Sequence, residues 1–194
     1  MSTLAGTLRS WLGQEIVVDR RARAAVGVLA FALAIALGAQ VAVYLPFTPV
    51  PITLQTLFVV LAGVVLGPRL GALAAGAYVA VGAAGAPIFA NGAGGLAWLM
   101  GPTGGYLLAA PLAALVAGSV GGRGAGALRT AAGLALGVLT MYVGGVTQLQ
   151  TLTGEPWGAV LALGVYPFLA GDAVKLVAAL WIVRGARATS FGRF

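Results

Sequence analysis

Charged residues are so scarce and so unevenly placed in this chain that a membrane must be its main solvent. No Asp, Glu, Lys or Arg interrupts 24–68 or 70–122. Charged residues make up only 8% of the whole sequence and hydrophobic residues 60%. A soluble domain carries about 25% charged residues. A water-soluble surface cannot be built from this composition, so the sequence predicts an integral membrane protein.

Six apolar stretches are candidates for spanning helices, and most of them approach the ~20 residues that a hydrocarbon core requires. Turn-forming sequences rich in Pro and Gly separate them. The predicted spans are 25–45, 52–67, 69–86, 102–120, 128–149 and 158–183. The sequence thus predicts an all-α integral membrane protein with six transmembrane helices in one bundle.

The basic residues predict which side of the membrane each loop faces. Ten of the eleven lie in the terminal segments, or in and at the edges of the loops after the second and fourth predicted spans. Because cytoplasmic loops carry an excess of Lys and Arg, we expect both termini in the cytoplasm. The predicted parts are a cytoplasmic segment (1–24), a membrane domain (25–184) and a cytoplasmic tail (185–194). The net charge of +7 is then a topology signal and not a sign of nucleic-acid binding.

The chain lacks the residues that most catalytic and metal sites use. It contains no Cys and no His. Its only Lys is followed by Leu176, which excludes the P-loop pattern of ATP-driven pumps. We therefore expect no enzyme activity, no metal and no cofactor. If the protein moves a solute, it borrows energy from a partner, works as a homo-oligomer or only equilibrates the solute.

One charged pair lies inside the sixth predicted span, in AGDAVKL at 170–176. Asp172 and Lys175 are three residues apart and so share a helix face. Each charge costs roughly 3 kcal/mol to place at the membrane centre, and such groups are functional by default. A neutral Asp–Lys pair suits a ligand with adjacent N–H and C=O groups, or a carboxylate if Lys175 turns away. The alternative is an internal ion pair that only neutralises itself.

Five further polar or aromatic residues are candidate ligand contacts in the half of the bundle away from the basic loops. Thr53 and Gln55 open the second span, and an amide inside a span is rare without a partner. Asn91 begins a glycine-rich run that ends in GPTGGY. Tyr78 and Tyr106 are candidates for the pocket wall. The alternatives are an interhelical hydrogen bond for Gln55, a turn position for Asn91, and packing or the interfacial aromatic belt for the tyrosines.

Four motifs together resemble those of one family. They are P-x-T-x-Q-T at 51–56, LGPRLG at 66–71, G-x-P-x-F at 85–89 and GPTGGY at 101–106. In this combination the chain resembles the BioY family, the biotin-specific substrate-binding (S) components of energy-coupling factor (ECF) transporters. The resemblance is dense over residues 46–118 and returns at Asp172 and Lys175. It implies high-affinity capture of biotin from outside the cell at the bacterial cytoplasmic membrane. The partners it implies are a transmembrane coupling protein and two cytoplasmic ATPases.

The resemblance also implies residue roles. Asp172 is assigned to a ureido N–H of biotin and Lys175 to its C=O, with the valeryl carboxylate near Asn91. The reverse, with Lys175 on the carboxylate, stays open. S components dock through small residues on the first span, and the pairs Ala30/Ala34 and Ala32/Ala36 are candidates, with packing inside the fold as the equal alternative. Three other functions remain open: an S component for another vitamin, a solitary oligomeric biotin transporter, and a membrane assembly subunit that transports nothing.

Overall fold

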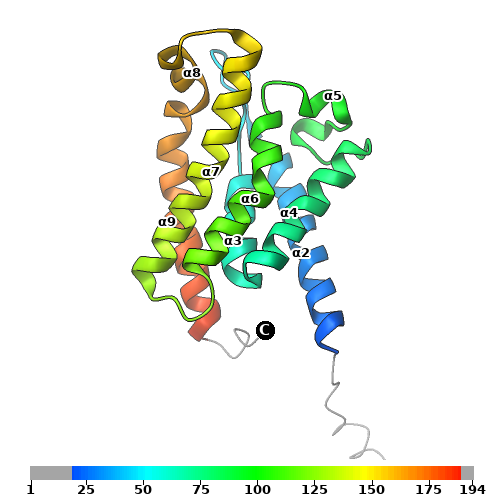
Figure 1. Ribbon diagram of the computed structural model, residues 1–194, viewed down its shortest axis with the longest axis vertical. Coiled ribbons are helices and arrows are strands. Elements are labelled where there is room, and N and C mark those ends of the chain that lie inside the picture. The colour runs from blue at the N-terminus through cyan, green and yellow to red at the C-terminus, as the bar shows by residue number, and fades with distance from the viewer. Residues whose placement is uncertain (1–18, 189–194) are drawn as a thin grey trace, which may run out of the picture.

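The computed structural model describes residues 19–188, which form a bundle of helices running roughly side by side (Figure 1). The longer helices are α2 (Arg20–Gln40), α3 (Gln55–Leu66), α4 (Pro68–Ala83), α6 (Gly104–Gly121), α7 (Ala127–Thr153) and α9 (Tyr166–Ala188). The shorter elements are β1 (Ala42–Val43), β2 (Ile52–Thr53), η1 (Ala90–Gly92), α5 (Leu96–Leu99) and α8 (Trp157–Gly164). The two strands pair antiparallel, Ala42 with Thr53 and Val43 with Ile52.

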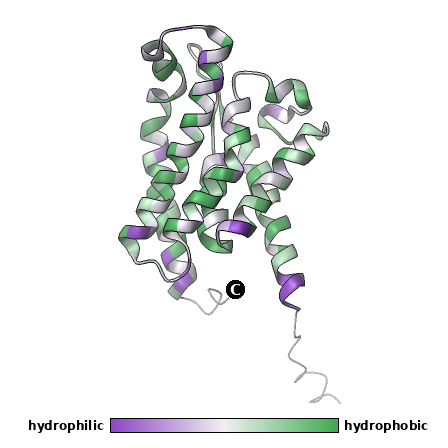
Figure 2. Ribbon diagram, viewed as in Figure 1, coloured by the Kyte–Doolittle hydropathy of each residue, from purple (hydrophilic) through white to green (hydrophobic). Residues whose placement is uncertain are grey.

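Four of the helices, α2, α6, α7 and α9, are long and apolar enough to cross a membrane. Helices α3 and α4 occupy the second and third predicted spans but contain 12 and 16 residues. Several apolar membrane-crossing helices make this a multi-pass membrane protein. The start of α2 and the end of α9 lie at the same end of the bundle (Figure 1). Figure 2 shows strongly hydrophilic segments gathered at that end and largely apolar helices above it.

The sixth predicted span was wrong as a single helix, because the chain breaks at Val165 into α8 and α9. Pro167 has no backbone N–H, so it cannot bond the carbonyl of Leu163 four residues earlier. Instead, the Thr48 hydroxyl donates to that carbonyl at 2.7 Å. The next carbonyl, of Gly164, accepts from the Tyr106 hydroxyl, also at 2.7 Å. Side chains from distant elements thus replace the helix bonds that are lost at the break.

Small residues let the central helices approach closely. A Cβ atom on Gly63 of α3 would lie 2.0 Å from the carbonyl oxygen of Ala114 on α6. A Cβ on Gly105 of α6 would lie 2.2 Å from the carbonyl oxygen of Gly144 on α7. Only glycine fits at such contacts, as is common where membrane helices pack. The glycine-rich composition is therefore used mainly to bring α3, α6 and α7 together.

Two larger apolar cores fill most of the described bundle, beside a small third cluster between α7 and α8. One is centred on α2, α4 and α6 and includes Ile35, Tyr78 and Phe89. The other joins α3, α6, α7 and α9. Its buried members are Val60, Leu61, Val64, Ala117, Leu134, Val138, Ala179 and Val183. This second core lies on the side of Asp172 and Lys175 nearer the C-terminal end of α9, so it separates the pair from that end of the bundle.

Candidate functional site

A cavity opens in the half of the bundle away from the basic end. Its empty volume is about 580 Å³, a figure that includes the open space at its mouth. The lining comes from the loop before α3 and from α3, η1, α5, α6, α7 and α9. Its members are Val50, Pro51, Thr53, Gln55, Thr56, Ala90, Trp98, Thr103, Tyr106, Leu107, Met141, Tyr142, Phe168, Asp172 and Lys175.

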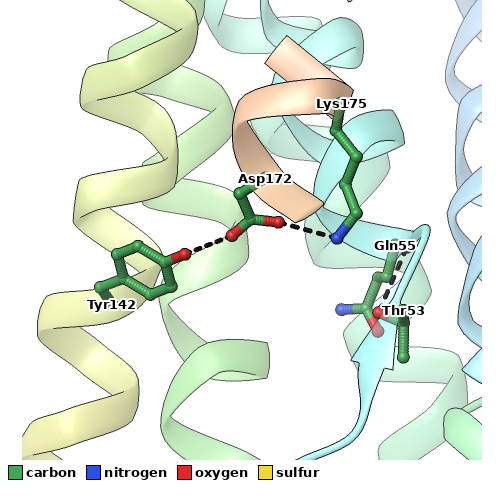
Figure 3. Close-up of polar contacts among 5 residues, drawn as sticks. All are labelled: Thr53, Gln55, Tyr142, Asp172 and Lys175. Carbon is green, nitrogen blue, oxygen red and sulfur yellow. Dashed lines mark hydrogen bonds and ion pairs between the residues drawn. The ribbon is translucent and has the colours of Figure 1, made fainter. Parts of the chain in front are cut away.

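The charged pair lies in the wall of this cavity. Lys175 Nζ donates to Asp172 Oδ1 at 2.7 Å. The Tyr142 hydroxyl of α7 donates to the other carboxylate oxygen, Oδ2. Figure 3 shows the three side chains in one row, with Asp172 between Tyr142 and Lys175. The side chains of Lys175 and Asp172 are only 11% and 8% exposed, so the carboxylate is held at both oxygens in a largely buried position.

The pair keeps hydrogen-bonding capacity that the protein does not use. A lysine ammonium has three N–H donors, and each carboxylate oxygen has two lone pairs. Among residues 19–188, Lys175 bonds only Asp172, and Asp172 accepts one donor at each oxygen. Two donors and two lone pairs therefore remain beside the cavity. This arrangement can bind a ligand that presents an acceptor next to an N–H donor.

Gln55 and Thr53 line the cavity at the start of α3. Thr53 Oγ1 accepts from the backbone N–H of Gln55 at 3.3 Å, a local turn bond just before the helix. The Gln55 carbonyl oxygen accepts from the Tyr78 hydroxyl at 3.3 Å. Tyr78 is fully buried and packs edge-on against Phe89, with 5.5 Å between ring centroids. Of the three predicted contacts, Thr53 and Gln55 line the cavity, while Tyr78 lies behind Gln55.

Tyr106 lines the cavity and also joins three helices. Its ring lies directly over Gly145 of α7, where a Cβ would come within 2.1 Å of the ring. Its hydroxyl donates to the Gly164 carbonyl at the break between α8 and α9. The predicted pocket residue is therefore also a structural contact that fixes the start of the helix carrying Asp172 and Lys175.

Two glutamines hold the long loop between α4 and α6 over the cavity. Gln40 at the end of α2 donates to the carbonyls of Ile88 and Phe89 and accepts from Gly92 N–H. Gln148 of α7 donates to the carbonyls of Leu99 and Gly101, both at 2.7 Å. These bonds position η1 and α5, and with them the lining residues Ala90 and Trp98.

Asn91, a predicted ligand contact, lies outside the cavity lining. Its side chain is exposed and its backbone is left-handed, with φ 60° and ψ 32°. Asn is one of the few residues that tolerate this conformation. Its neighbour Ala90 reaches the cavity instead. The structure thus favours the turn alternative for Asn91.

The alanine pairs of α2 differ in their surroundings. Ala32 and Ala36 are partly buried and pack against the apolar core. Ala30 is exposed, and Ala34 is partly exposed. The packing alternative therefore describes Ala32/Ala36, whereas Ala30/Ala34 stays available as a candidate docking pair.

Tyr142, which touches Asp172 directly, was not predicted as a site residue. The signal was a tyrosine well inside the fifth predicted span instead of near an end, where interfacial aromatic residues lie. Apart from Thr56 and Trp98, the other lining residues are mostly apolar or small and give no signal in a chain of this composition. No cluster of three or more potential metal ligands occurs among residues 19–188.

Comparisons with known proteins point to one family. The model of the BioY family matches residues 10–191. A "Probable biotin transporter BioY" of Pyrococcus horikoshii is 43% identical over 145 residues, which are 75% of this chain and 84% of the relative. A "Biotin transporter BioY" of Thermotoga maritima is 40% identical over 153 residues, 78% of this chain and 88% of the relative.

The fold has a solved counterpart in the crystal structure of the S-component for biotin from an ECF-type ABC transporter. The TM-score is 0.80 at 24% identity, over 90% of this chain and 96% of that one. The names of the relatives describe transporters, which agrees with the expectation that the chain is not an enzyme. The family match, extending over nearly the whole sequence, also agrees with the motif resemblance. The chain belongs to the BioY family.

Proposed function

We propose that this protein captures biotin from outside the cell and delivers it for uptake as the S component of an ECF-type transporter. The observation that carries the proposal is the Asp172–Lys175 pair, which is buried in a cavity wall and keeps unused donors and lone pairs. Biotin carries a ureido ring with two N–H donors and one C=O acceptor. This ligand chemistry matches the unused groups, and the names of the relatives support the same ligand.

In this proposal Asp172 accepts a ureido N–H and Lys175 donates to the ureido oxygen. Tyr142 holds the carboxylate so that its free lone pairs face the ligand. The cavity wall around them is mostly apolar or aromatic, with Trp98, Phe168 and Leu107 among its members, and it suits the fused rings. We assign the valeryl carboxylate to the side of Thr103, which lines the cavity at the start of α6, because Asn91 does not reach the cavity.

The membrane arrangement proposed is six spans, with both termini in the cytoplasm of a bacterial cell. The shared end of α2 and α9 and the basic residues at that end support it. The cavity then faces outward. The energy source is a coupling protein with two ATPases, docked at Ala30/Ala34. A solitary oligomeric transporter is the alternative, and uptake in a host that lacks coupling proteins tests it.

The ligand is identified by denaturing protein purified from cells grown with biotin and analysing the released molecules by mass spectrometry. We expect biotin in an amount close to that of the protein. Release of a different vitamin would agree with an S component but would show that biotin is not its ligand. If no small molecule is released and added biotin does not bind, the assembly-subunit alternative gains instead.

The orientation of biotin is tested with biotin amide, which keeps the ureido ring but lacks the negative charge. If Lys175 binds the ureido oxygen, Lys175→Ala lowers the affinities for biotin and for biotin amide by the same factor. A much larger effect on biotin than on the amide would place Lys175 on the carboxylate and reverse the proposed orientation.

A further inference from the structure

Gln55 has one end bonded to protein and the other end open to the cavity. The residue is only 6% exposed. Its carbonyl oxygen accepts from the Tyr78 hydroxyl. Within residues 19–188 its amide nitrogen makes no hydrogen bond to protein. Figure 3 shows that nitrogen turned toward the side of the cavity where Asp172 and Tyr142 lie, and Lys175 reaches toward Gln55 from above. The unpaired donor therefore belongs to the ligand-facing surface.

Tyr78 decides which end of the Gln55 amide faces the cavity. Tyr78 is 1% exposed, so water does not reach its hydroxyl group. Within the described residues Gln55 supplies the one acceptor for that hydroxyl hydrogen. If the amide turned over, the hydroxyl would meet an NH2 group and its hydrogen would lose its acceptor. A buried donor without an acceptor costs about 1–3 kcal/mol, which favours the observed orientation strongly.

We propose that Tyr78 is a positioning residue that fixes Gln55 as a hydrogen-bond donor toward the ligand. Lys175 and Gln55 then offer two donors to one ligand acceptor, and Asp172 offers an acceptor to a neighbouring ligand N–H. This inference rests on the proposed function and adds a specificity determinant to it. The site then distinguishes the acceptor of the ureido group from its donors. The Tyr78 hydroxyl orients Gln55 for this purpose but does not touch the ligand.

2-Iminobiotin is the probe that separates this role from ordinary packing. It has the ring system and side chain of biotin, but the ureido C=O is replaced by C=NH, which is protonated at neutral pH and presents only donors. A fixed Gln55 donor therefore weakens the binding of iminobiotin relative to that of biotin. Lys175 repels the charged probe as well, but it does so in every variant, so the change in the affinity ratio isolates Gln55.

The experiment measures the dissociation constants of biotin and 2-iminobiotin for full-length purified protein and for Tyr78→Phe. This change removes the hydroxyl but keeps the ring on Phe89, and it frees the Gln55 amide to turn its oxygen toward the ligand. We expect the preference for biotin over iminobiotin to fall by about tenfold. Tyr44→Phe, at an exposed tyrosine outside the cavity lining, is the matched control and leaves the preference unchanged.

Two further variants keep the test decisive if Tyr78→Phe folds poorly. Gln55→Glu puts acceptors where the NH2 group was, so it should shift the preference toward iminobiotin. Gln55→Leu removes the polar group, and adding Tyr78→Phe to it should then change the preference no further. An unchanged preference in Tyr78→Phe or Gln55→Glu, with biotin still bound, would overturn this inference alone. Failure of the unaltered protein to bind biotin would overturn the proposed function and this inference with it.

Discussion

Helix α9 carries two polar clusters that differ in how fully the protein uses their hydrogen bonds. At its C-terminal end, the Arg187 guanidinium makes four bonds of 2.7–3.0 Å, all to protein. Their acceptors are the carbonyls of Gly121, Gly122 and Ala125 and the hydroxyl of Thr130. About three turns earlier, Lys175 makes one bond, to Asp172, beside a cavity.

The difference separates a structural cation from a ligand-binding one. Arg187 donates to the carbonyls at the end of α6, where helix carbonyls lack intrahelical partners, and so it fastens α9 to the loop between α6 and α7. Lys175 and Asp172 satisfy each other only in part. Charge in a membrane helix is therefore not by itself a sign of function. Hydrogen-bonding capacity that the fold leaves unused next to an open cavity is a more informative sign of function.

The largest effect on stability is expected from removing one member of the Asp172–Lys175 pair while leaving the other. Asp172→Leu alone leaves the Lys175 charge unpaired, so the melting temperature should fall by several degrees. The double change to leucine should be neutral or stabilising, by up to ~4 kcal/mol, as at other buried ion pairs. Thermal unfolding in detergent of the unaltered protein, the single variant and the double variant checks this. A double variant that is as unstable as the single one would show that the pair is structural.

Tyr142→Phe should weaken biotin binding by about tenfold, because one hydrogen bond to a carboxylate is lost and Asp172 is less firmly held. Its melting temperature should change little, since the ring stays in place. The control is Tyr166→Phe, at an exposed tyrosine on the same helix as Asp172. If both changes altered binding equally, Tyr142 would have no special role.

Arg187→Ala sharpens the comparison from the other side. Loss of its bonds should cost about 2 kcal/mol and so lower the melting temperature, while biotin affinity stays within about threefold of the unaltered protein. Arg184→Ala is the matched control, because Arg184 lies over the Trp181 ring at 5.8 Å and makes no bond to the α6–α7 loop in the described structure. A large loss of biotin affinity in Arg187→Ala, beside the loss of stability, would contradict a purely structural role.

The smallest effect is expected at Thr48, whose hydroxyl joins the loop before α3 to Leu163. Thr48→Val removes this bond and the one from Val50 N–H at 3.2 Å. Val50 and Pro51 line the cavity, so we expect biotin to dissociate a few times faster. Thr151→Val removes only a bond within α7 and is the control. Stopped-flow measurement of dissociation distinguishes the two.

Much of the fold could be predicted from the sequence because the apolar stretches and the turns between them are local signals. The break at Val165 could not, because a proline inside an apolar stretch indicates a kink as readily as a full break. The kink becomes a full break where Thr48 and Tyr106 supply donors to the freed carbonyls, and these residues are far away in the chain. Helix α3 is shorter than the predicted span because β2 takes up the first residues of that span.

The charged pair was the predictable part of the site, because Asp172 and Lys175 are three residues apart in a region without other charges. Tyr142 was not predictable, since its contact with Asp172 joins two helices and depends on the close packing of α7. The role of Asn91 could not be decided from the sequence, because a polar residue in a glycine-rich run has the same signal in a turn as in a binding loop. The backbone conformation decides between them.

The most direct test of the account is a calorimetric titration of biotin into the purified protein, with Asp172→Ala and Lys175→Ala beside it. We predict that the unaltered protein binds biotin at micromolar concentration or below. Loss of either partner should weaken binding by roughly 100-fold or more, with the fold retained as judged by circular dichroism. Equal affinity in all three proteins would contradict the central claim that the buried pair is kept to bind the ligand.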